Sequence, residues 1–383
     1  MRILLAGGGS GGHVTPLKAI ARQLRLQKGT VELYVITDRS FYGRAQEIFA
    51  DMADVRIKRI FAGKLRRYRS KSLLWHVIHL PTLLKNIRDL IYIALGTIQS
   101  LWLLIRTRPD VVFCKGGFVC VPVGYVAHLF KIPIIIHDSD TKPGLTNRML
   151  SRFAKTIATG MPAEFYPYDL SKMVYTGMPV EKVYQPQSKK QQDEHKSALG
   201  FQPSQPVLLL TGGGNGSIPL NEVLSRGAGE LLQQGWGIIH LAGKGKVGAV
   251  KTDRDQLPKN LQQNWHIEEF AQMAPRLLAA DIIVARTSAN TLQECANAQK
   301  TVIGIPSPHL ADQNMNAEYF NSKGALVMLA ESSFNEPSTL VDAVRELYAD
   351  QYKAKSIAKA LHDNFAKPDA AIELAKIILA TKN

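Results

Sequence analysis

The feature that most constrains the fold is a loop of five glycines and one serine, Gly7–Gly12. It follows the apolar run Arg2–Ala6 and precedes the helical pattern of Pro16–Gln27. A loop of this kind lets backbone N–H groups approach a phosphate at the start of a helix. The same order returns where the strand pattern Pro206–Leu210 leads into a second glycine loop, Thr211–Gly216. The sequence therefore predicts two nucleotide-binding-type halves.

Strands and helices alternate along both halves, which predicts in each a parallel sheet covered on both faces. The other strands predicted in the first half are Val31–Thr37, Val55–Ile60, Asp110–Cys114, Ile132–His137 and Thr156–Thr159. The other helices predicted there are Arg44–Met52, Ser72–Arg88, Leu90–Arg106, Pro122–Phe130 and Gly144–Phe153. The other strands predicted in the second half are Gly237–Ala242, Trp265–Glu268, Asp281–Ala285, Thr301–Ile305 and Ala325–Leu329.

The length of 383 residues fits two domains of ordinary size. We expect an α/β fold of two Rossmann-like, doubly wound domains, residues 1–180 and 181–368, joined near Gly177–Val180. A final helix at Asp369–Thr381 is expected to be able to cross back to the first domain. The three cysteines, an odd number without metal-ligand spacing, indicate a reducing compartment and no disulfide framework.

Positive charge is concentrated near the N-terminus. Residues 1–110 hold 19 of the 47 Lys and Arg residues but only 7 of the 32 acidic ones. Eight basic residues and no acidic one lie within Arg56–Lys71, and an apolar segment that includes Trp75 follows at once. Cations beside Trp and Leu suit an anionic bilayer surface. Nucleic acid is the rival partner, but no nucleic-acid-binding motif is present. The residues predicted to meet the membrane are Lys64, Arg66, Arg67, Arg69 and Trp75.

The uncharged stretch Leu90–Ile105 raises the alternative of a transmembrane span. It is shorter than the roughly 20 residues that a span needs, and Gly96, Thr97, Gln99 and Ser100 interrupt it. No signal-peptide pattern opens the sequence, since Met1–Ala6 runs straight into glycines. The sequence therefore favours a protein on the cytoplasmic face of a membrane, held peripherally.

The first loop also matches a dinucleotide fingerprint through Gly7, Gly9 and Gly12, with Asp38 as the acidic residue that NAD binding requires. Other features point elsewhere. His13 follows the loop directly, and the glycine pair Gly116-Gly117 ends another strand of the same half. Several glycine loops, one of them in the other half, indicate a phosphate-rich donor and a phosphate-rich acceptor.

Glycines, His13 and the segment around them carry a wider resemblance. Gly8-Gly9-Ser10-Gly11-Gly12-His13-Val14-Thr15-Pro16 resembles the signature of the glycosyltransferase family 28 enzymes that convert lipid I to lipid II. The similarity continues, in order and spacing, through Gly63–Arg67, Pro109–Val112, Gly116–Val119, His137-Asp138, Gly144–Asn147, Arg286–Glu294 and Gln313. The resemblance implies a GT-B fold with two Rossmann-like domains facing each other across a cleft, an inverting mechanism and no obligatory metal or other cofactor. It implies UDP-N-acetylglucosamine (UDP-GlcNAc) as donor, held mainly by the second domain. The implied acceptor is an undecaprenyl-diphosphate-linked sugar, whose diphosphate meets the first glycine loops.

The resemblance also assigns site residues. Glu294 corresponds to the glutamate that accepts hydrogen bonds from the ribose hydroxyls, and Ala289, Asn290 and Thr291 open a helix whose N–H groups meet the donor diphosphate. The remaining donor-binding candidates are Ser10, Gly11, Gly12, Asp140, Gly214, Asn215, Ala271, Leu292, Gln293, Asp312 and Gln313. The acceptor-side candidates are Gly8, Gly9, Gly116 and Gly117.

Two residues compete for the role of general base, the group that removes the proton from the acceptor's 4-hydroxyl. His13 follows a glycine loop at a helix start, where the helix dipole favours the neutral imidazole that a base requires. Asp138 is the other candidate, at a position where the family usually has glutamate. The sequence leaves both open.

Besides Asp138, four positions depart from the family pattern. Asp140 replaces an asparagine, Glu181 replaces a donor-contacting arginine, and Gly214 replaces a phosphate-binding serine. Asp312 stands where the family commonly has His or Gln. The leading hypothesis is transfer of N-acetylglucosamine to lipid I in peptidoglycan synthesis. The alternatives are another UDP-sugar-dependent lipid glycosyltransferase of diacylglycerol type, a UDP-sugar epimerase of similar fold, and a catalytically weakened or non-catalytic family member.

Overall fold

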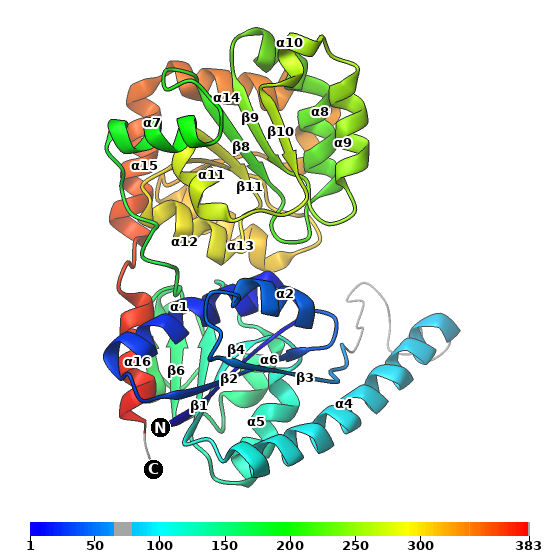
Figure 1. Ribbon diagram of the computed structural model, residues 1–383, viewed down its shortest axis with the longest axis vertical. Helices are drawn as coiled ribbons and strands as arrows, with labels where there is room; N and C mark the ends of the chain where they lie inside the picture. The colour runs from blue at the N-terminus through cyan, green and yellow to red at the C-terminus, as the bar shows by residue number, and fades with distance from the viewer. Residues whose placement is uncertain (65–78, 337, 382–383) are drawn as a thin grey trace. The chain divides into compact units, whose positions relative to one another are not determined.

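The computed structural model describes residues 1–64, 79–336 and 338–381, which divide into two compact units (Figure 1). Unit 1 comprises Met1–Ser139, Pro143–Glu181 and Asp369–Asn383, and unit 2 comprises Asp140–Lys142 and Lys182–Pro368. Each unit is built on a parallel sheet with helices on its faces, which confirms the predicted α/β class.

Seven strands form the sheet in the described part of unit 1, in the order β3-β2-β1-β4-β5-β6-β7. They are β1 (Arg2–Gly7), β2 (Glu32–Asp38), β3 (Arg56–Ile60), β4 (Val111–Gly116), β5 (Ile134–Asp138), β6 (Thr156–Thr159) and β7 (Met173–Tyr175). The helices are α1 (Gly11–Gln27), α2 (Tyr42–Ile48), α4 (Leu80–Thr107), α5 (Cys120–Leu129), α6 (Leu145–Leu150) and α16 (Ala370–Ala380), and 3-10 turns lie at Ala163–Phe165 and Leu170–Lys172.

Alternate residues of β1 face opposite sides of this sheet, as strand geometry requires. Ile3 and Leu5 lie in the apolar core that α1 and α16 cover. Leu4 and Ala6 lie in a second core beneath α4 and α5. Helix α16 packs on α1, where the Gln27 side chain donates to the carbonyl of Ile372 at 3.1 Å. The C-terminal helix therefore completes unit 1.

Helix α4 corrects the sequence analysis. The sequence predicts two helices with a break near Asp89, whereas the structure has one continuous helix of 28 residues. The polar and small residues that suggested interruptions form its buried side, which includes Asp89, Gly96 and Ser100. A Cβ at Gly96 would lie 2.0 Å from the carbonyl oxygen of Phe61, so only glycine permits this close approach.

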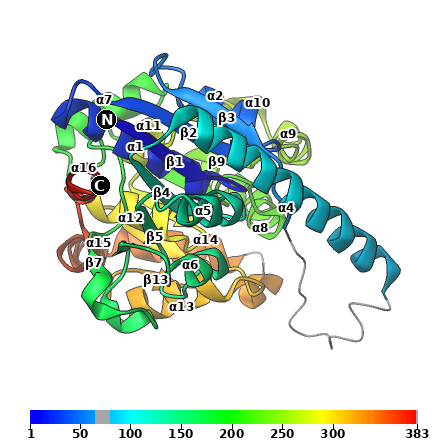
Figure 2. The same cartoon turned by 90° about the horizontal axis from the view of Figure 1, so that it is seen from below.

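Most of the exposed side chains of α4 are apolar. The N-terminal part of the helix extends beyond the rest of unit 1 in both views (Figures 1 and 2). By length and composition α4 is long and apolar enough to cross a membrane, although 28% of its most apolar window is buried within the structure. The sequence-based argument that this segment is too short to span a membrane was therefore wrong.

Six strands form the sheet in the described part of unit 2, in the order β10-β9-β8-β11-β12-β13. They are β8 (Val207–Thr211), β9 (Gly237–Leu241), β10 (Trp265–Glu268), β11 (Ile282–Ala285), β12 (Thr301–Gly304) and β13 (Val327–Met328). The helices are α7 (Lys189–Ala198), α8 (Ile218–Gln233), α9 (Val247–Asp255), α10 (Lys259–Gln262), α11 (Met273–Ala279), α12 (Ala289–Asn297), α13 (Ala311–Ser322), α14 (Ser338–Ala349) and α15 (Gln351–Phe365), with a 3-10 turn at Glu331–Asn335.

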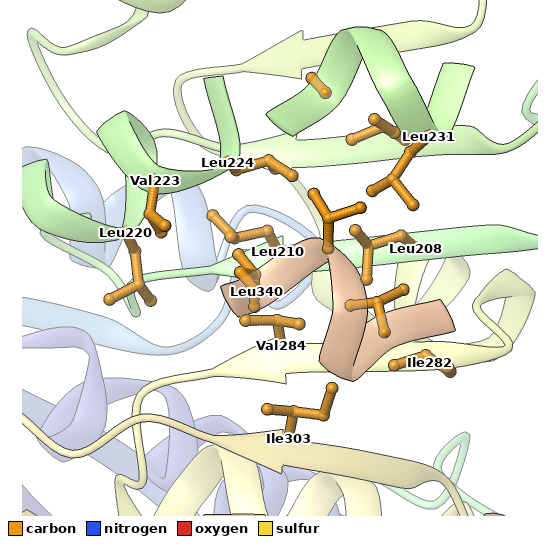
Figure 3. Close-up of a cluster of buried hydrophobic side chains, with 14 of the residues drawn as sticks. Leu208, Leu210, Leu220, Val223, Leu224, Leu231, Ile282, Val284, Ile303 and Leu340 are labelled. Carbon is orange, nitrogen blue, oxygen red and sulfur yellow. The ribbon is translucent and has the colours of Figure 1, made fainter. Parts of the chain in front are cut away.

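The core of unit 2 is made by aliphatic side chains from its central strands and from α8 and α14. Figure 3 shows Leu208, Leu210 and Val284 of the sheet gathered with Leu224 of α8 and Leu340 of α14. All five side chains are inaccessible to solvent. This packing fixes β8 and β11 side by side, so that the loops after them leave the sheet at the same edge.

Candidate functional site

The two glycine segments of unit 1 follow adjacent strands. Strand order in the sheet reverses between β1 and β4, and ligands of open parallel sheets bind beyond the carboxyl ends of strands at such a reversal. Gly117, with a φ of +81°, lies so near the first loop that a Cβ would be 2.2 Å from the carbonyl oxygen of Gly8. The structure thus brings the Gly7–Gly12 loop and Gly116-Gly117 together, as the sequence predicts.

His13 lies against both glycine segments and is partly exposed. Its Nδ1 is 2.8 Å from the carbonyl oxygen of Gly8, which can only accept a hydrogen bond. In the neutral ring the hydrogen is therefore on Nδ1, and Nε2 keeps its lone pair. A Cβ at Gly116 would be 3.3 Å from that Nε2, so the glycine leaves one side of the atom open. This geometry suits a proton acceptor.

The surroundings of His13 keep its imidazole neutral. Desolvation and the charge of Lys115 lower the pKa of His13 to about 4, against smaller opposing effects of the Gly8 hydrogen bond and of Asp38. The ring is therefore uncharged at neutral pH and available as a base.

Asp38, the acidic residue of the dinucleotide hypothesis, serves the loop itself. Its Oδ1 accepts the N–H of Gly9 at 2.6 Å, and its Oδ2 accepts the N–H groups of Ser40 and Phe41 at 3.1 and 3.2 Å. The carboxylate is 3% exposed. Asp38 thus holds the glycine loop in place. Its two carboxylate oxygens accept backbone N–H groups, whereas the dinucleotide hypothesis needs them to accept the hydroxyls of a ribose.

Asp138, the second candidate base, is buried at the carboxyl end of β5. It accepts the Tyr168 hydroxyl at 2.6 Å and the N–H of Gly144 at 3.2 Å. Burial and the Asp138 charge raise the pKa of the Tyr168 phenol, so Tyr168 stays a hydrogen donor. Through these hydrogen bonds Asp138 orients the loop before α6.

Three residues around His13 and Asp138 were given no role by the sequence analysis: Lys115, Asn147 and Tyr168. Lys115 is 1% exposed and donates to the Ser139 hydroxyl. Asn147 of α6 donates from its amide to the carbonyl of His137 at 3.0 Å. Tyr168 holds Asp138. The sequence signals were a lysine at the end of the otherwise apolar run Val111–Cys114 and, for Asn147, its place in the segment Gly144–Asn147 that carries the resemblance.

In unit 2 the predicted donor residues follow the carboxyl ends of their strands. The strand order reverses between β8 and β11, so the Gly212–Gly216 loop and the start of α12 lie at a second reversal. The N–H groups that open α12 belong to Ala289, Asn290 and Thr291, and the dipole of the helix favours negative charge there. Glu294 follows on the same helix and is 9% exposed.

Asp140 occupies part of this helix start. Its Oδ1 accepts the N–H of Ala289 at 3.3 Å and the amide of Asn316 at 2.9 Å. Burial and the charge of Asp140 raise the pKa of Asp312, so the two carboxyl groups lie close enough to interact. Gln313 accepts the N–H of Ser307 at 3.0 Å through its side-chain oxygen. The departures at 140 and 312 thus form one acidic cluster.

The second glycine loop is tied to neighbouring cations. Lys246 donates to the carbonyl oxygens of Asn215 and Gly216. Arg286 donates to the Ser217 hydroxyl at 2.6 Å and pairs with Glu331. A Cβ at Gly214 would meet no atom within 4 Å, so the serine of the family pattern is sterically permitted there.

Some predicted donor residues have side chains committed to the fold. The amide of Gln293 donates to the Asn297 side chain at 3.0 Å and to the carbonyl of Phe365 at 2.7 Å. Leu292 is fully buried. A donor contact from either would have to come from the backbone. Ala271 follows β10 at the same edge of the sheet and is partly exposed.

The predicted membrane residues are described only in part. Lys64 is exposed. Arg66, Arg67, Arg69 and Trp75 lie outside the described residues.

Glu181, where the family pattern has arginine, is paired within unit 1. It forms an ion pair with Arg22 and lies 3.9 Å from Lys18, both on α1. Asp51 completes the group and is 2.9 Å from Lys18. In the structure the Glu181 carboxylate therefore interacts with basic side chains of α1. Among the described residues no group of three His, Cys, Asp or Glu side chains could hold a metal ion.

Comparisons with known proteins match both halves of the chain. The model of the glycosyltransferase family 28 N-terminal domain matches residues 3–159, and that of the family 28 C-terminal domain matches residues 207–374. A relative from Lachnospira eligens is named UDP-N-acetylglucosamine–N-acetylmuramyl-(pentapeptide) pyrophosphoryl-undecaprenol N-acetylglucosamine transferase. It is 32% identical over 355 residues, which cover 92% of both chains.

Two solved structures illustrate the likeness of fold. MurG of Acinetobacter baumannii has a TM-score of 0.66 and 22% identity, with 99% of each chain covered. The UDP-GlcNAc 2-epimerase of Neisseria meningitidis, bound to UDP-GlcNAc, has a TM-score of 0.63 and 14% identity, with 100% of this chain and 99% of that one covered. At these identities the likeness concerns the fold alone. Membership of a family is shown by the family models and by the relatives in sequence.

Proposed function

The chain belongs to glycosyltransferase family 28, and from that membership we propose that it transfers N-acetylglucosamine from UDP-GlcNAc to lipid I, with inversion at the anomeric carbon. The hydroxyl that attacks is the 4-hydroxyl of the undecaprenyl-diphosphate-linked N-acetylmuramyl group. The product is lipid II, the precursor of peptidoglycan. The observation that carries the mechanism is the neutral His13, whose Nε2 lone pair is open between two glycine segments.

Unit 1 takes the acceptor in this proposal. The N–H groups of Gly8, Gly9, Gly116 and Gly117 are where the acceptor diphosphate is expected to bind, because glycine loops expose backbone donors to phosphate. His13 Nε2 then accepts the proton of the 4-hydroxyl. The oxygen forms a bond to the donor's anomeric carbon as the bond from that carbon to the UDP oxygen breaks, and UDP leaves with the electron pair. Asp138 orients the loop through Gly144.

Unit 2 takes the donor. The start of α12 supplies N–H groups and a positive dipole end to the UDP diphosphate, where charge develops as the bond breaks. Glu294 accepts from the ribose hydroxyls, and Gln313 with Asp140 and Asp312 meets the sugar. Carboxylates accept hydrogen bonds from sugar hydroxyls, so the substitution of acidic residues at 140 and 312 is compatible with this part of the ligand.

The protein is proposed to lie on the cytoplasmic face of the membrane with α4 against the bilayer. Its exposed apolar residues recur at helical spacing along one side, from Leu80 through Leu84, Ile87, Ile91, Leu95, Ile98 and Trp102 to Ile105. Exposed cations on or beside the helix, Lys85, Arg88, Arg106 and Arg108, suit anionic lipid.

A surface orientation fits α4 better than a span. The helix is bound to unit 1 by its polar side, where Gln99 accepts the N–H of Phe61 at 2.7 Å and Gly96 meets the backbone of Phe61. Crossing the bilayer would break these contacts and place Asp89 and Ser100 in hydrocarbon, which is costly. Lying in the interface keeps both sides of the helix satisfied.

A transfer assay tests the function. Purified protein is supplied with UDP-GlcNAc and either a lipid I analogue or diacylglycerol, and both disaccharide-lipid product and UDP are measured. We expect product and UDP in equal amounts with the lipid I analogue only. Turnover on diacylglycerol alone would establish the other lipid glycosyltransferase, and donor binding without any turnover would establish a non-catalytic member.

Restoring a serine at position 214 is expected to strengthen donor binding. Gly214→Ser adds a hydroxyl at a position with free space, and a hydrogen bond to a charged phosphate contributes about 1.5–3 kcal/mol. The KM for UDP-GlcNAc should fall by a factor of about 10 to about 150. Gly214→Ala, which adds the carbon without the hydroxyl, is the matched control and should leave KM near the starting value. Equal KM values for the two variants would remove this loop from the donor phosphate site.

A further inference from the structure

One charged residue beside the proposed base has no part in the mechanism above. Lys115 is the last residue of β4 before its terminal glycine, and its side chain is 1% exposed. Its ammonium group donates to the hydroxyl of Ser139, directly after β5. Both attachments lie at the carboxyl ends of adjacent strands, the edge where His13 meets Gly116 and Gly117. Burial of a charged ammonium group carries a desolvation cost, so we examined what the charge does at this edge of the sheet.

Two imidazoles of unit 1 feel this charge. His13 packs on the glycines that directly follow Lys115. His137, on β5, is fully buried and its Nε2 donates to the carbonyl of Gly177 at 2.9 Å. After burial, the charge of Lys115 is the main influence that lowers the pKa of each ring. A nearby positive charge disfavours protonation of an imidazole.

We propose that Lys115 is a positioning residue of the transfer reaction, which acts through His13 by holding the imidazole in its neutral form before the acceptor binds. The proposal deepens the function given above and depends on His13 being the base. The charged groups that face His13 are Lys115 from β4 and Asp38 from the end of β2. They act in opposite directions, and Asp38 is already engaged by three backbone N–H groups of its surroundings. Burial is the largest cause of the lowered His13 pKa, and of the two charges that of Lys115 has the larger effect.

The direction of the effect follows from the sign of this interaction. Removal of the Lys115 charge raises the pKa of His13 from about 4 toward the ordinary histidine value. Protonated imidazole has no lone pair to offer, so activity is lost at higher pH than in the parent protein. Above the ordinary value the ring is neutral in both proteins, and their rates should be similar.

The test compares Lys115→Met with the parent protein in two measurements. The first is an NMR titration of the His13 ring in protein labelled at histidine, from about pH 4 to about pH 8, with His13→Gln to assign the signal. The second is the pH profile of kcat/KM with UDP-GlcNAc and a lipid I analogue. We expect the His13 pKa and the acid limb of the profile to rise together by about one unit or more.

Three further variants separate the effect of the charge from that of the structure. Lys115→Arg keeps the positive charge and should keep both the titration and the acid limb of the parent. Lys155→Met removes an exposed lysine from the same unit and should change neither. Thermal unfolding of each variant shows whether it is folded. If Lys115→Met fails to fold, Ser139→Ala replaces it in the test, because it removes the hydroxyl that holds the ammonium group. Ser139→Ala should raise the His13 pKa by a smaller amount.

The outcomes are distinct. An unchanged His13 pKa in Lys115→Met overturns the proposal, whatever the activity. A raised pKa with an unchanged acid limb also overturns it and shows that His13 is not the base. Absence of turnover in the parent protein would instead defeat the proposed function, while the titration would still report on Lys115.

Discussion

Replacement of His13 by alanine is expected to lower kcat by a factor of about 10²–10⁴, the usual contribution of a general base. The reason is the open Nε2 lone pair, fixed by the Nδ1 contact of 2.8 Å to Gly8. Donor binding should be unchanged, because the residues that the proposed mechanism assigns to the donor, the start of α12, Glu294 and Gln313, belong to unit 2. Steady-state kinetics with a lipid I analogue give kcat, and calorimetry with UDP-GlcNAc gives the donor affinity. The low pKa of His13, about 4, further predicts no loss of parent activity as pH falls from about 8 to about 6.

His128→Ala is the matched control, because His128 is an exposed histidine on α5 that stacks on Phe153. It should retain the parent kcat. Full turnover by His13→Ala would show that the base is elsewhere. Asp138 is then the next candidate, and Asp138→Asn would be expected to show the loss instead. In the present account Asp138→Asn acts through the loop at Gly144 and Tyr168, so it should lower the melting temperature as well as the rate.

Polar substitution on the outer side of α4 is expected to weaken membrane binding by about 10²-fold. Ile98 and Trp102 are 63% and 60% exposed and lie one helical turn apart. Burial of one such side chain contributes about 1.5–3 kcal/mol, so loss of two, partly buried in the interface, costs about 3 kcal/mol. Cosedimentation of Ile98→Gln/Trp102→Gln with vesicles that contain anionic lipid measures the change. Activity on a water-soluble acceptor should stay constant, whereas KM for a membrane-embedded acceptor should rise.

The control for this pair is Leu26→Gln/Leu170→Gln. Both leucines belong to unit 1 and are more exposed than Ile98, at 75% and 70%, but neither is on α4. Vesicle binding should be that of the parent protein. Equal binding by the α4 variant and this control would contradict the assignment of α4 as the membrane surface.

The regular parts of the fold could be predicted because their burial pattern is local. Strands β6 and β10 have the bounds that the sequence predicts, and the two glycine loops follow β1 and β8 as expected. Strand β7 was missed because three residues are too few to display an alternation. The sequence-based prediction divided helix α4 in error because it assumed that apolar residues face the core. Under that assumption the polar residues Asp89 and Ser100 interrupt the helix, whereas in the structure they are buried. On this helix the apolar side faces outward, a property of its surroundings that the local pattern does not contain.

The candidate site shows the same division. His13, the glycines beside it and the start of α12 were identified because their chemistry lies within short segments. Contacts between distant segments were beyond sequence reasoning. Asp140 meets the N–H of Ala289 across 149 positions of the chain, and Glu181 meets Arg22 across 159. Each of these acidic departures has found a partner that the family pattern alone does not reveal.

The proposed reaction is an inverting transfer of N-acetylglucosamine to the 4-hydroxyl of a lipid-linked N-acetylmuramyl group. The most direct measurement is NMR of the isolated product made from UDP-GlcNAc, in which the sugar is α-linked, and a lipid I analogue. We expect a β linkage to carbon 4, read from the anomeric proton coupling and from the correlation across the new glycosidic bond. An α linkage, attachment at another hydroxyl, or a product formed only with diacylglycerol would contradict it.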